Sequence, residues 1–353
     1  MANSFKLFLS AISCAALLAS ATFANAAENS ALQFSNKSRN YISIVGSSTV
    51  YPFSAAIAEK FGRQKKFRTP TVEATGTGGG FKLFCSGVGF EFPDFSNASR
   101  KIEESEIERC AENGIKNVGE IKIGYDGIVL ANSVAGKKFT LSKRQIFLAL
   151  ADKIPYRDKL IANPFYKWNQ IDPSLPSTRI RVYGPPSTSG TRDSFVELVL
   201  EKACINIKEF VSFYPNTKIR QGKCRTIRSD GTFIEAGEND NLILQKLHND
   251  HDALGIFGFS FLIENKNSIQ AATVDGVAPS FDSIISGKYS ISRPLFIYFK
   301  REHLDKTPGM REFISSIVSK DALGPDGYLM QKGLIPLSDS ELKKTRDEIL
   351  KGL

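Results

Sequence analysis

Short apolar, β-branched runs alternate along the chain with stretches of helical periodicity. In three places a run of this kind leads through a turn rich in glycine, serine and threonine into a periodic stretch, at 42–61, 71–86 and 180–203. Strands that alternate with helices are typical of α/β proteins, whose strands are mostly parallel. The pattern therefore predicts an α/β fold with mixed, mainly parallel sheets.

Further predicted elements extend the pattern towards the C-terminus. Apolar runs predict strands at 120–130, 255–262 and 294–299, and periodic stretches predict helices at 142–151, 242–248 and 307–319. A proline at the second position of the last stretch suits the start of a helix. The sequence shows no coiled-coil heptads, low-complexity tract or solenoid repeat, and 27–39 is expected to be a loose lead.

The first 26 residues have the composition of a secretory signal. Lys6 precedes an apolar run at 7–18, and Ala24-Asn25-Ala26 places small residues where a signal peptidase reads them. The run is shorter than the ~18 residues that a membrane-spanning helix needs. We expect cleavage after Ala26 and release into the periplasm. A lipoprotein anchored through Cys14 is less favoured, because the small-residue site lies downstream of it, and a buried N-terminal helix is the other alternative.

Export would leave four cysteines, Cys85, Cys110, Cys204 and Cys224. An even number in an oxidising compartment predicts two disulfides. Of the three connectivities we favour Cys85–Cys110 and Cys204–Cys224, because each closes a local loop. No two of these cysteines have the close spacing of zinc ligands, and the histidines are not spaced around them, so neither a metal nor another cofactor is expected.

The size and charge of the chain narrow its class further. Without its first 26 residues, the chain of 353 is still longer than one hydrophobic core usually serves, so two domains are expected. The formal net charge of +9 suits an anion or an acidic partner surface. The basic residues are scattered apart from short clusters, so no nucleic acid is expected as a partner.

The turns before the predicted helices hold the candidate chemistry. A helix N-terminus leaves N–H groups unpaired, glycine lets a ligand approach them, and serine or threonine adds a hydroxyl donor. Such a turn suits an oxyanion, although serine and threonine also cap helices for structural reasons. Three such turns occur, at 46–49, 76–80 and 184–191. A fourth motif adds Ser99 and Arg100, whose planar fork matches phosphate oxygens. Together they favour an oxyanion site.

Four motifs resemble those of the periplasmic phosphate-binding proteins of bacterial phosphate ABC importers. GSSTVYPF at 46–53, GTGGGFK at 76–82, NASR at 97–100 and TSGTRD at 188–193 occur in this order. The resemblance implies the type II periplasmic-binding-protein fold, in which two α/β lobes are joined by a hinge of two crossing strands. It also implies dehydrated phosphate held in the interlobe cleft mainly by neutral donors.

The resemblance also implies a lobe division and a role. Lobe 1 is expected at 39–127 plus 257–353 and lobe 2 at 128–256, with crossings near Gly127 and Gly258. The protein is expected to be a monomer without catalytic activity. It would capture inorganic phosphate and deliver it to the membrane permease and ATPase subunits of an ABC importer.

Carried over position by position, the resemblance implies a set of binding residues. They are Ser48, Thr49, Val50, Tyr51, Thr77, Gly78, Ser99, Arg100, Ser189, Gly190 and Thr191. Some family members have an aspartate at the position of Arg100, which accepts a phosphate proton, and an arginine where this chain has Pro185. Here Arg192 is a candidate second cation.

The identity of the proton acceptor is open from the sequence. The candidates are Asp126, Asp193, Glu238 and Asp240. Phosphate keeps a proton near neutral pH and sulfate does not, so a buried carboxylate that accepts this proton rejects sulfate. Selectivity for phosphate therefore depends on which of these carboxylates meets the anion.

Other functions fit the sequence less well. An exported phosphohydrolase would use Ser189 or Ser194 as nucleophile, but the chain has few histidines and no G-x-S-x-G elbow. An adhesion module would need a repeat or an anchor, and neither is evident. The same cleft with another tetrahedral oxyanion is the nearest alternative.

Overall fold

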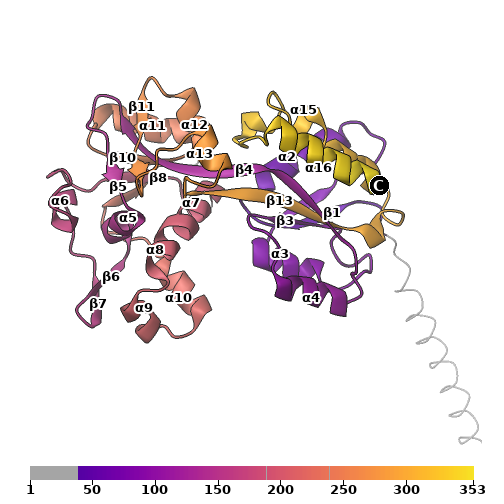
Figure 1. Cartoon of the computed structure of the whole chain (residues 1–353), viewed down its shortest axis with the longest axis horizontal. Coiled ribbons are helices and arrows are strands. Elements are labelled where there is room, and N and C mark those ends of the chain that lie inside the picture. Colours follow the sequence, from indigo (N-terminus) through magenta and orange to yellow (C-terminus); the bar gives the residue numbers. More distant parts are fainter. Residues whose placement is uncertain (1–38, 188, 238) are drawn as a thin grey trace, which may run out of the picture. The chain divides into compact units, whose positions relative to one another are not determined.

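The computed structural model describes residues 39–187, 189–237 and 239–353 (Figure 1). The predicted signal peptide, with its cleavage site, and nearly all of the loose lead lie outside the described residues. The fold below belongs to the unit Tyr41–Leu353. None of the helices in the described part combines the length and apolar character that a membrane span requires.

The strands and helices have the following bounds. The strands are β1 Ser43–Gly46, β2 Thr71–Ala74, β3 Phe95–Ala98, β4 Val118–Ser133, β5 Thr140–Leu141, β6 Lys153–Tyr156, β7 Lys159–Ala162, β8 Val182–Gly184, β9 Phe233–Glu235, β10 Leu254–Gly258, β11 Ile269–Ala271, β12 Thr273–Val274 and β13 Ser292–Lys300. The α-helices are α2 Tyr51–Gly62, α3 Thr77–Phe84, α4 Glu104–Glu112, α5 Lys143–Leu150, α6 Trp168–Ile171, α7 Gly190–Phe195, α8 Lys202–Cys204, α9 Lys208–Phe213, α10 Thr217–Cys224, α11 Asp240–Asn249, α12 Phe259–Glu264, α13 Phe281–Ile285, α14 Met310–Ile317, α15 Lys320–Leu323 and α16 Asp339–Lys351. A π-helical segment, Val196–Glu201, joins α7 to α8, and 3-10 turns cover Arg301–His303 and Met330–Lys332.

A nine-stranded mixed sheet organises these elements. Its order is β2-β1-β3-β13-β4-β10-β8-β9, and β11 also pairs with β4. The strands β1, β2 and β3 are parallel at one end, and β8, β9 and β10 are parallel at the other. Antiparallel pairs through β13 and β4 join the two ends. Helices cover the outer parts of the sheet (Figure 1), which confirms the predicted two-lobed α/β fold.

Two neighbouring strands carry the chain between the lobes. β4 pairs with β13 from Gly127 opposite Ser292 to Val118 opposite Lys300. The rest of β4 pairs with β10 and β11. Figure 1 shows β4 and β13 side by side between the two groups of helices. These two strands form the expected hinge of crossing strands.

The strand pairing points to a later second crossing than the one expected near Gly258. β10 ends at Gly258, opposite Ile128 of β4. The chain then turns back, because β11 pairs with the last residues of β4. The chain does not pair with the first half of β4 again until β13, where Ser292 lies opposite Gly127. We therefore propose that lobe 2 covers 128–291 instead of ending at 256; the lobe limits otherwise stay a prediction.

Most predicted elements are present, with one mixed segment. The apolar run predicted as a strand at 255–262 is a strand only to Gly258. This glycine is the N-cap residue of α12, which takes up the rest of the run. A short apolar run does not separate strand from buried helix by periodicity. The helix predicted at 192–203 is present as α7, the π-helical segment and α8 in succession.

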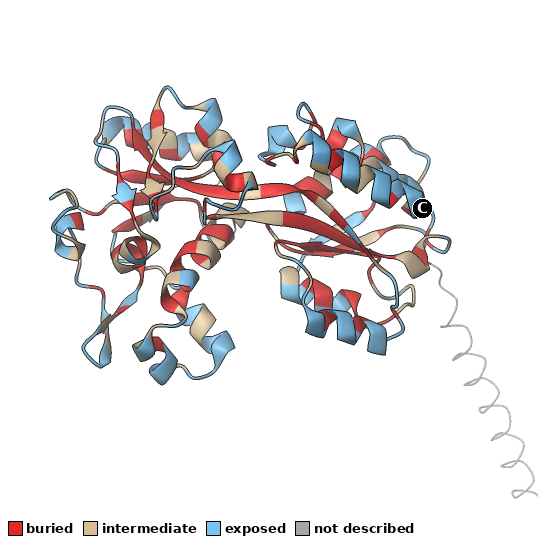
Figure 2. Cartoon of the chain, in the orientation of Figure 1, coloured by how far each residue is buried: buried red, intermediate tan, exposed pale blue. Residues whose placement is uncertain are grey.

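Both predicted disulfides are formed. Cys85, at the end of α3, bonds to Cys110 in α4, and Cys204 in α8 bonds to Cys224 in α10. All four residues are fully buried. Figure 2 shows buried residues along the sheet and on the inner faces of the helices, with exposed residues on the outer helix faces. The disulfides thus join the end of α3 to α4 and α8 to α10 inside this buried region.

Candidate functional site

The loops after β1 and β2 meet because the two strands are parallel neighbours. β1 leads through Ser47 and Ser48 into α2, and β2 leads through Gly76 into α3. Gly46 has a φ of 126°, and a Cβ there would lie 2.2 Å from the carbonyl oxygen of Asn97. A Cβ on Gly80 would lie 2.5 Å from the Cα of Gly46. The glycines are therefore needed for α3 to pack beside the first loop.

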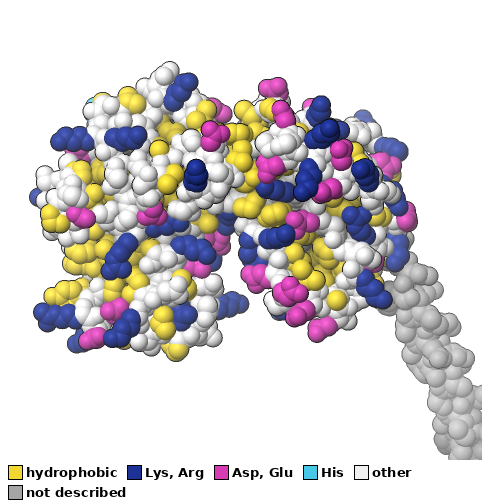
Figure 3. All heavy atoms as spheres, viewed as in Figure 1, with side chains coloured by type: hydrophobic (Ala, Val, Ile, Leu, Met, Phe, Trp, Pro, Cys, Tyr) yellow, Lys and Arg dark blue, Asp and Glu magenta, His cyan; other side chains and the backbone are white. Residues whose placement is uncertain are grey.

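A cleft of about 760 Å³ lies over these loops. Its size is within the range of ligand-binding sites. Its lining residues are Ser47, Ser48, Thr49, Gly76, Thr77, Gly78, Ser99, Arg100, Lys101, Glu103, Asp193, Glu197, Leu198, Glu201, Lys202, Gln221, Arg225, Arg293 and Pro294. Figure 3 shows basic and acidic side chains alternating around the hollow between the two halves. The structure thus gathers six of the predicted binding residues in one cleft.

The other predicted binding residues lie beside this lining. Val50 is fully buried and Tyr51 is exposed at the start of α2. Ser189 is buried and precedes Gly190 and Thr191 at the start of α7. A Cβ on Gly190 would lie 3.1 Å from the Cα of Thr49, so the first and third loops touch. Thr188 lies outside the described residues.

Hydroxyl groups from two loops meet in the cleft. Oγ1 of Thr77 lies 3.0 Å from Oγ of Ser99 and accepts a hydrogen bond from the backbone N–H of Ser99 at 3.1 Å. Thr77 is the first residue of α3, and Ser99 follows β3. The second and fourth motifs therefore present their hydroxyls at one place.

Arg100 lines the cleft but is already paired. Its two terminal nitrogens donate to both carboxylate oxygens of Glu106, at 2.9 and 2.8 Å. This bidentate pair raises the pKa of Arg100. The Glu106 side chain is only 8% exposed. The charge of Arg100 is thus largely neutralised within its own lobe.

Among the candidate proton acceptors, Asp193 lies in the cleft lining. Its Oδ2 accepts a hydrogen bond of 2.6 Å from Oγ of Ser48. Burial raises the pKa of Asp126, against the effect of nearby Arg293. Asp240 begins α11 and, like Asp126, is not part of the lining. Glu238 lies outside the described residues.

The candidate second cation faces away from the cleft. The guanidinium of Arg192 lies 4.1 Å from the ring centroid of Phe233 and 3.8 Å from Oε1 of Glu235. Its Nη1 also donates to the carbonyl of Pro185. Arg192 is therefore not among the residues that line the cleft.

Sequence reasoning missed the arginine at the base of the cleft, Arg293. It stands in β13 opposite Asp126 of β4. Its Nη2 donates to Oγ1 of Thr49 at 2.9 Å and to Oγ of Ser194 at 2.7 Å, and its Nη1 donates to Glu197. The only sequence signal is an arginine just before a strand that starts with proline. That signal gains meaning once β13 is known to cross the cleft base.

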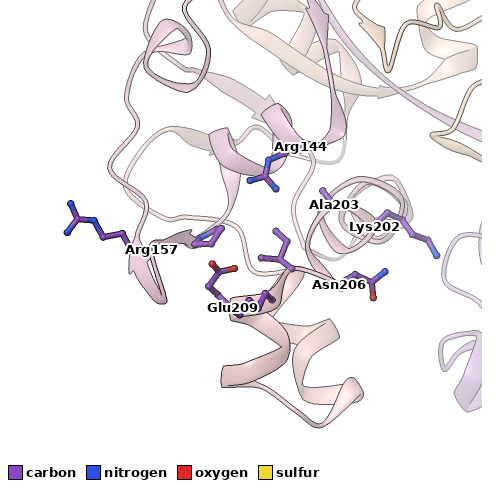
Figure 4. A pocket seen from close by; sticks show the side chains of 9 residues that line it. Arg144, Arg157, Lys202, Ala203, Asn206 and Glu209 are labelled. Atoms are coloured by element: carbon purple, nitrogen blue, oxygen red, sulfur yellow. The ribbon is translucent and has the colours of Figure 1, made fainter.

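A second hollow of about 510 Å³ lies in the part of the chain around α8 and α9. It is lined by Arg144, Pro155, Arg157, Lys202, Ala203, Asn206, Ile207, Lys208 and Glu209. In Figure 4 the side chains of Arg157 and Lys202 extend outwards on opposite sides. Because these two cations point away from each other, they cannot share one oxyanion in this hollow, and the loop-lined cleft remains the candidate.

Comparisons with known proteins agree with this geometry. Residues 33–321 match the family model described as the PBP superfamily domain. The chain is 32% identical over 292 residues to protein SphX of Synechococcus elongatus, covering 80% of this chain and 75% of that one. It is 29% identical over 278 residues to the phosphate-binding protein PstS of Staphylococcus saprophyticus, covering 77% and 74%.

Solved structures show the same fold. A possible phosphate-binding protein from Planctomyces limnophilus superposes with a TM-score of 0.71 at 28% identity, covering 89% of this chain and 98% of that one. An ABC-type phosphate transport receptor from Vibrio cholerae gives a TM-score of 0.57 at 19% identity, covering 84% and 100%, which is a likeness of fold alone. By its family model, its relatives and its fold, the chain belongs to the PBP superfamily.

Proposed function

We propose that this protein captures inorganic phosphate in the loop-lined cleft and delivers it to an ABC permease for import. The observation that carries the proposal is that four hydroxyl residues line one cleft: Ser48 and Thr49 before α2, Thr77 at the start of α3, and Ser99 after β3. A relative that is 29% identical and a solved structure that is 28% identical are both named for phosphate binding. Hydroxyls and helix N-termini are suitable neutral donors for an oxyanion.

The proposed ligands come from all four motifs. Ser48, Thr49 and the backbone of Val50 and Tyr51 would serve from the first loop, and Thr77 with Gly78 from the second. Ser99 and Arg100, with the loop Ser189, Gly190 and Thr191, complete the set. The arginines of the cleft have carboxylate partners. Neutral donors would therefore do most of the binding.

We infer that Asp193 accepts the proton of the bound phosphate. Of the three candidate carboxylates within the described residues it is the one in the cleft lining, and its hydrogen bond to Ser48 lies beside a proposed ligand. Protonated phosphate would donate to this carboxylate, while Ser48 turns to a phosphate oxygen. Sulfate has no proton to give, so its oxygen would face the carboxylate lone pairs without a hydrogen bond.

The remainder of the proposal concerns the setting. The signal peptide would be removed after Ala26, and the mature protein would act as a monomer in the periplasm. Its lobes would close on phosphate about β4 and β13, and the closed form would dock on the permease, whose ATPase subunits drive import. The protein would have no catalytic activity. In support, Ser194 is fully buried, where a phosphate ester could not reach its hydroxyl.

Calorimetry tests the proposal directly. The mature protein, freed of bound anion by unfolding and refolding, is titrated with phosphate and with sulfate. We expect saturable heat with phosphate alone, and absence of heat with phosphate would refute the function. Sulfate heat of equal strength would favour a general oxyanion carrier. Hydrolysis of a chromogenic phosphate ester that Ser194→Ala abolishes would favour the enzyme alternative instead.

A further inference from the structure

The positive charge that faces the bound anion has a different source from the one the motifs suggest. We propose that Arg293 supplies this charge, and that Glu197 competes with the anion for the Arg293 guanidinium. The inference rests on the proposed function, because it concerns the same cleft.

Arg293 has hydrogen-bonding capacity left for a ligand. Its side chain is only 10% exposed, yet it lines the cleft. An arginine has five N–H donors, and three donor contacts lead to Thr49, Ser194 and Glu197. The buried Nε has no hydrogen-bond acceptor among the described residues and lies 3.7 Å from Oδ2 of Asp126. A buried charged donor without an acceptor is costly, and an anion oxygen would provide one.

Arg293 also sets the direction of a neighbouring donor. Because Oγ1 of Thr49 accepts from Arg293 at 2.9 Å, the Thr49 hydroxyl hydrogen is free to point elsewhere. Oγ of Ser194 likewise accepts from Arg293 and donates to Asp126. The only acceptor in contact with the Thr49 hydroxyl among the described residues is Oγ of Ser194, at a long 3.4 Å, so an anion oxygen in the cleft would be the better acceptor for its hydrogen. Arg293 thus acts on the anion both through its charge and through Thr49.

The other arginines of the cleft are committed elsewhere. Arg100 is held by both oxygens of the buried Glu106. Arg225 pairs with Glu201 through Nε and with Glu197 through Nη1 at 3.1 Å. The lysines of the lining, Lys101 and Lys202, are exposed. The buried charge at the cleft base is therefore set by Arg293 and the carboxylates around it.

Glu197 is the carboxylate placed to compete with an anion. It lines the cleft, its side chain is 32% exposed, and it accepts from Arg293. An anion that takes up the Arg293 donors must share them with Glu197 or displace it. The carboxylate also repels the anion, so removing its charge should tighten binding.

A double-mutant cycle on phosphate affinity tests the proposal. Phosphate is titrated by calorimetry into the wild type, Arg293→Gln, Arg293→Lys, Glu197→Gln and the Arg293→Gln/Glu197→Gln double variant. We expect Arg293→Gln to weaken binding at least 30-fold, Arg293→Lys to weaken it less, and Glu197→Gln to tighten it 3- to 10-fold. In the double variant the tightening should be smaller, because only direct repulsion is then relieved, and such a coupling is not produced by general destabilisation.

Arg181→Gln is the matched control. Arg181 pairs with Asp250 and is not part of the cleft lining. The affinity of Arg181→Gln for phosphate should therefore equal that of the wild type. Arg293→Gln within 3-fold of the wild type would overturn the role of Arg293. Unchanged or weaker binding by Glu197→Gln would overturn the competition. If Arg293→Gln does not fold, Arg293→Lys takes its place under the same 3-fold limit. Glu197→Gln is judged as before. Absence of phosphate binding by the wild type would instead refute the proposed function.

Discussion

Replacing Asp193 by asparagine would change the anion preference of the cleft. The substitution keeps the shape of the side chain and its contact with Ser48, but removes the charge and replaces one acceptor oxygen by an N–H donor. Phosphate then loses the charged acceptor for its proton and keeps at most the weaker amide oxygen. Sulfate gains a donor and loses a repulsive neighbour. The two anions are therefore affected in opposite senses.

The expected magnitude follows from this one hydrogen bond. A hydrogen bond to a charged group contributes ~1.5–3 kcal/mol. At about 1.4 kcal/mol per tenfold change in affinity, this corresponds to a factor of roughly 10 to 150. Loss of the negative charge also weakens repulsion of both anions, and this effect cancels in their ratio. The ratio of sulfate to phosphate dissociation constants should therefore fall by roughly 10- to 150-fold.

Calorimetric titration of both anions into wild type and Asp193→Asn measures this ratio. Asp305→Asn serves as the control, because Asp305 is an exposed residue that pairs with Arg311 outside the cleft. An unchanged ratio in Asp193→Asn would refute the assignment of the proton acceptor. Asp126→Asn would then be the next variant to titrate, since Asp126 lies beside Arg293 at the cleft base.

Three further predictions concern stability. Gly46→Ala should destabilise the fold by ~1–3 kcal/mol, because its φ is positive and its Cβ has no room; an unchanged melting temperature would contradict this. Replacing both Cys204 and Cys224 by serine should lower the free energy of unfolding in urea by ~2–4 kcal/mol. A reductant should then lower this free energy less in the double variant than in the wild type. Burial would raise the pKa of Glu341, but hydrogen bonds from Lys122 and neighbouring hydroxyls lower it to about 2. The folded-state pKa is therefore below the unfolded value, so the stabilisation is present above pH ~4.5 and lost as the pH falls towards 2. Glu341→Gln should be less stable than the wild type at pH 7, and the difference should shrink steadily below pH ~4.5 and vanish below pH 2; a difference that does not shrink between pH 5 and pH 2 would exclude this cause.

Local patterns in the sequence predicted much of the fold. The strand, turn and helix around Gly46 could be predicted because the glycine turn and the proline at the start of α2 act on neighbouring residues. The disulfide pairing followed from loop size alone and is confirmed. The strand end at Gly258 was missed, because an apolar run suits either a strand or a buried helix.

The pairing of the charged side chains in the cleft could not be predicted from the sequence. Arg293 meets Thr49 and Ser194 through contacts that span 244 and 99 residues. Such contacts depend on strand pairing that no local motif specifies. Arg100 was expected to face the anion, and whether it does so stays a prediction. Its bond to Glu106, six residues away, shows how a nearby carboxylate can occupy a cation that a motif suggests is available.

The length of β4 has a mechanical consequence. One strand of 16 residues is bonded by its backbone to β13 over one part and to β10 and β11 over the other. Motion between the lobes must therefore twist a hydrogen-bonded ladder and cannot be absorbed by a loose linker, and sheets have a preferred twist. Such a hinge behaves as a torsion spring. On the proposed closure of the lobes about an anion, part of the binding free energy would be held as elastic strain in these two strands, and this strain would favour reopening once the anion has left.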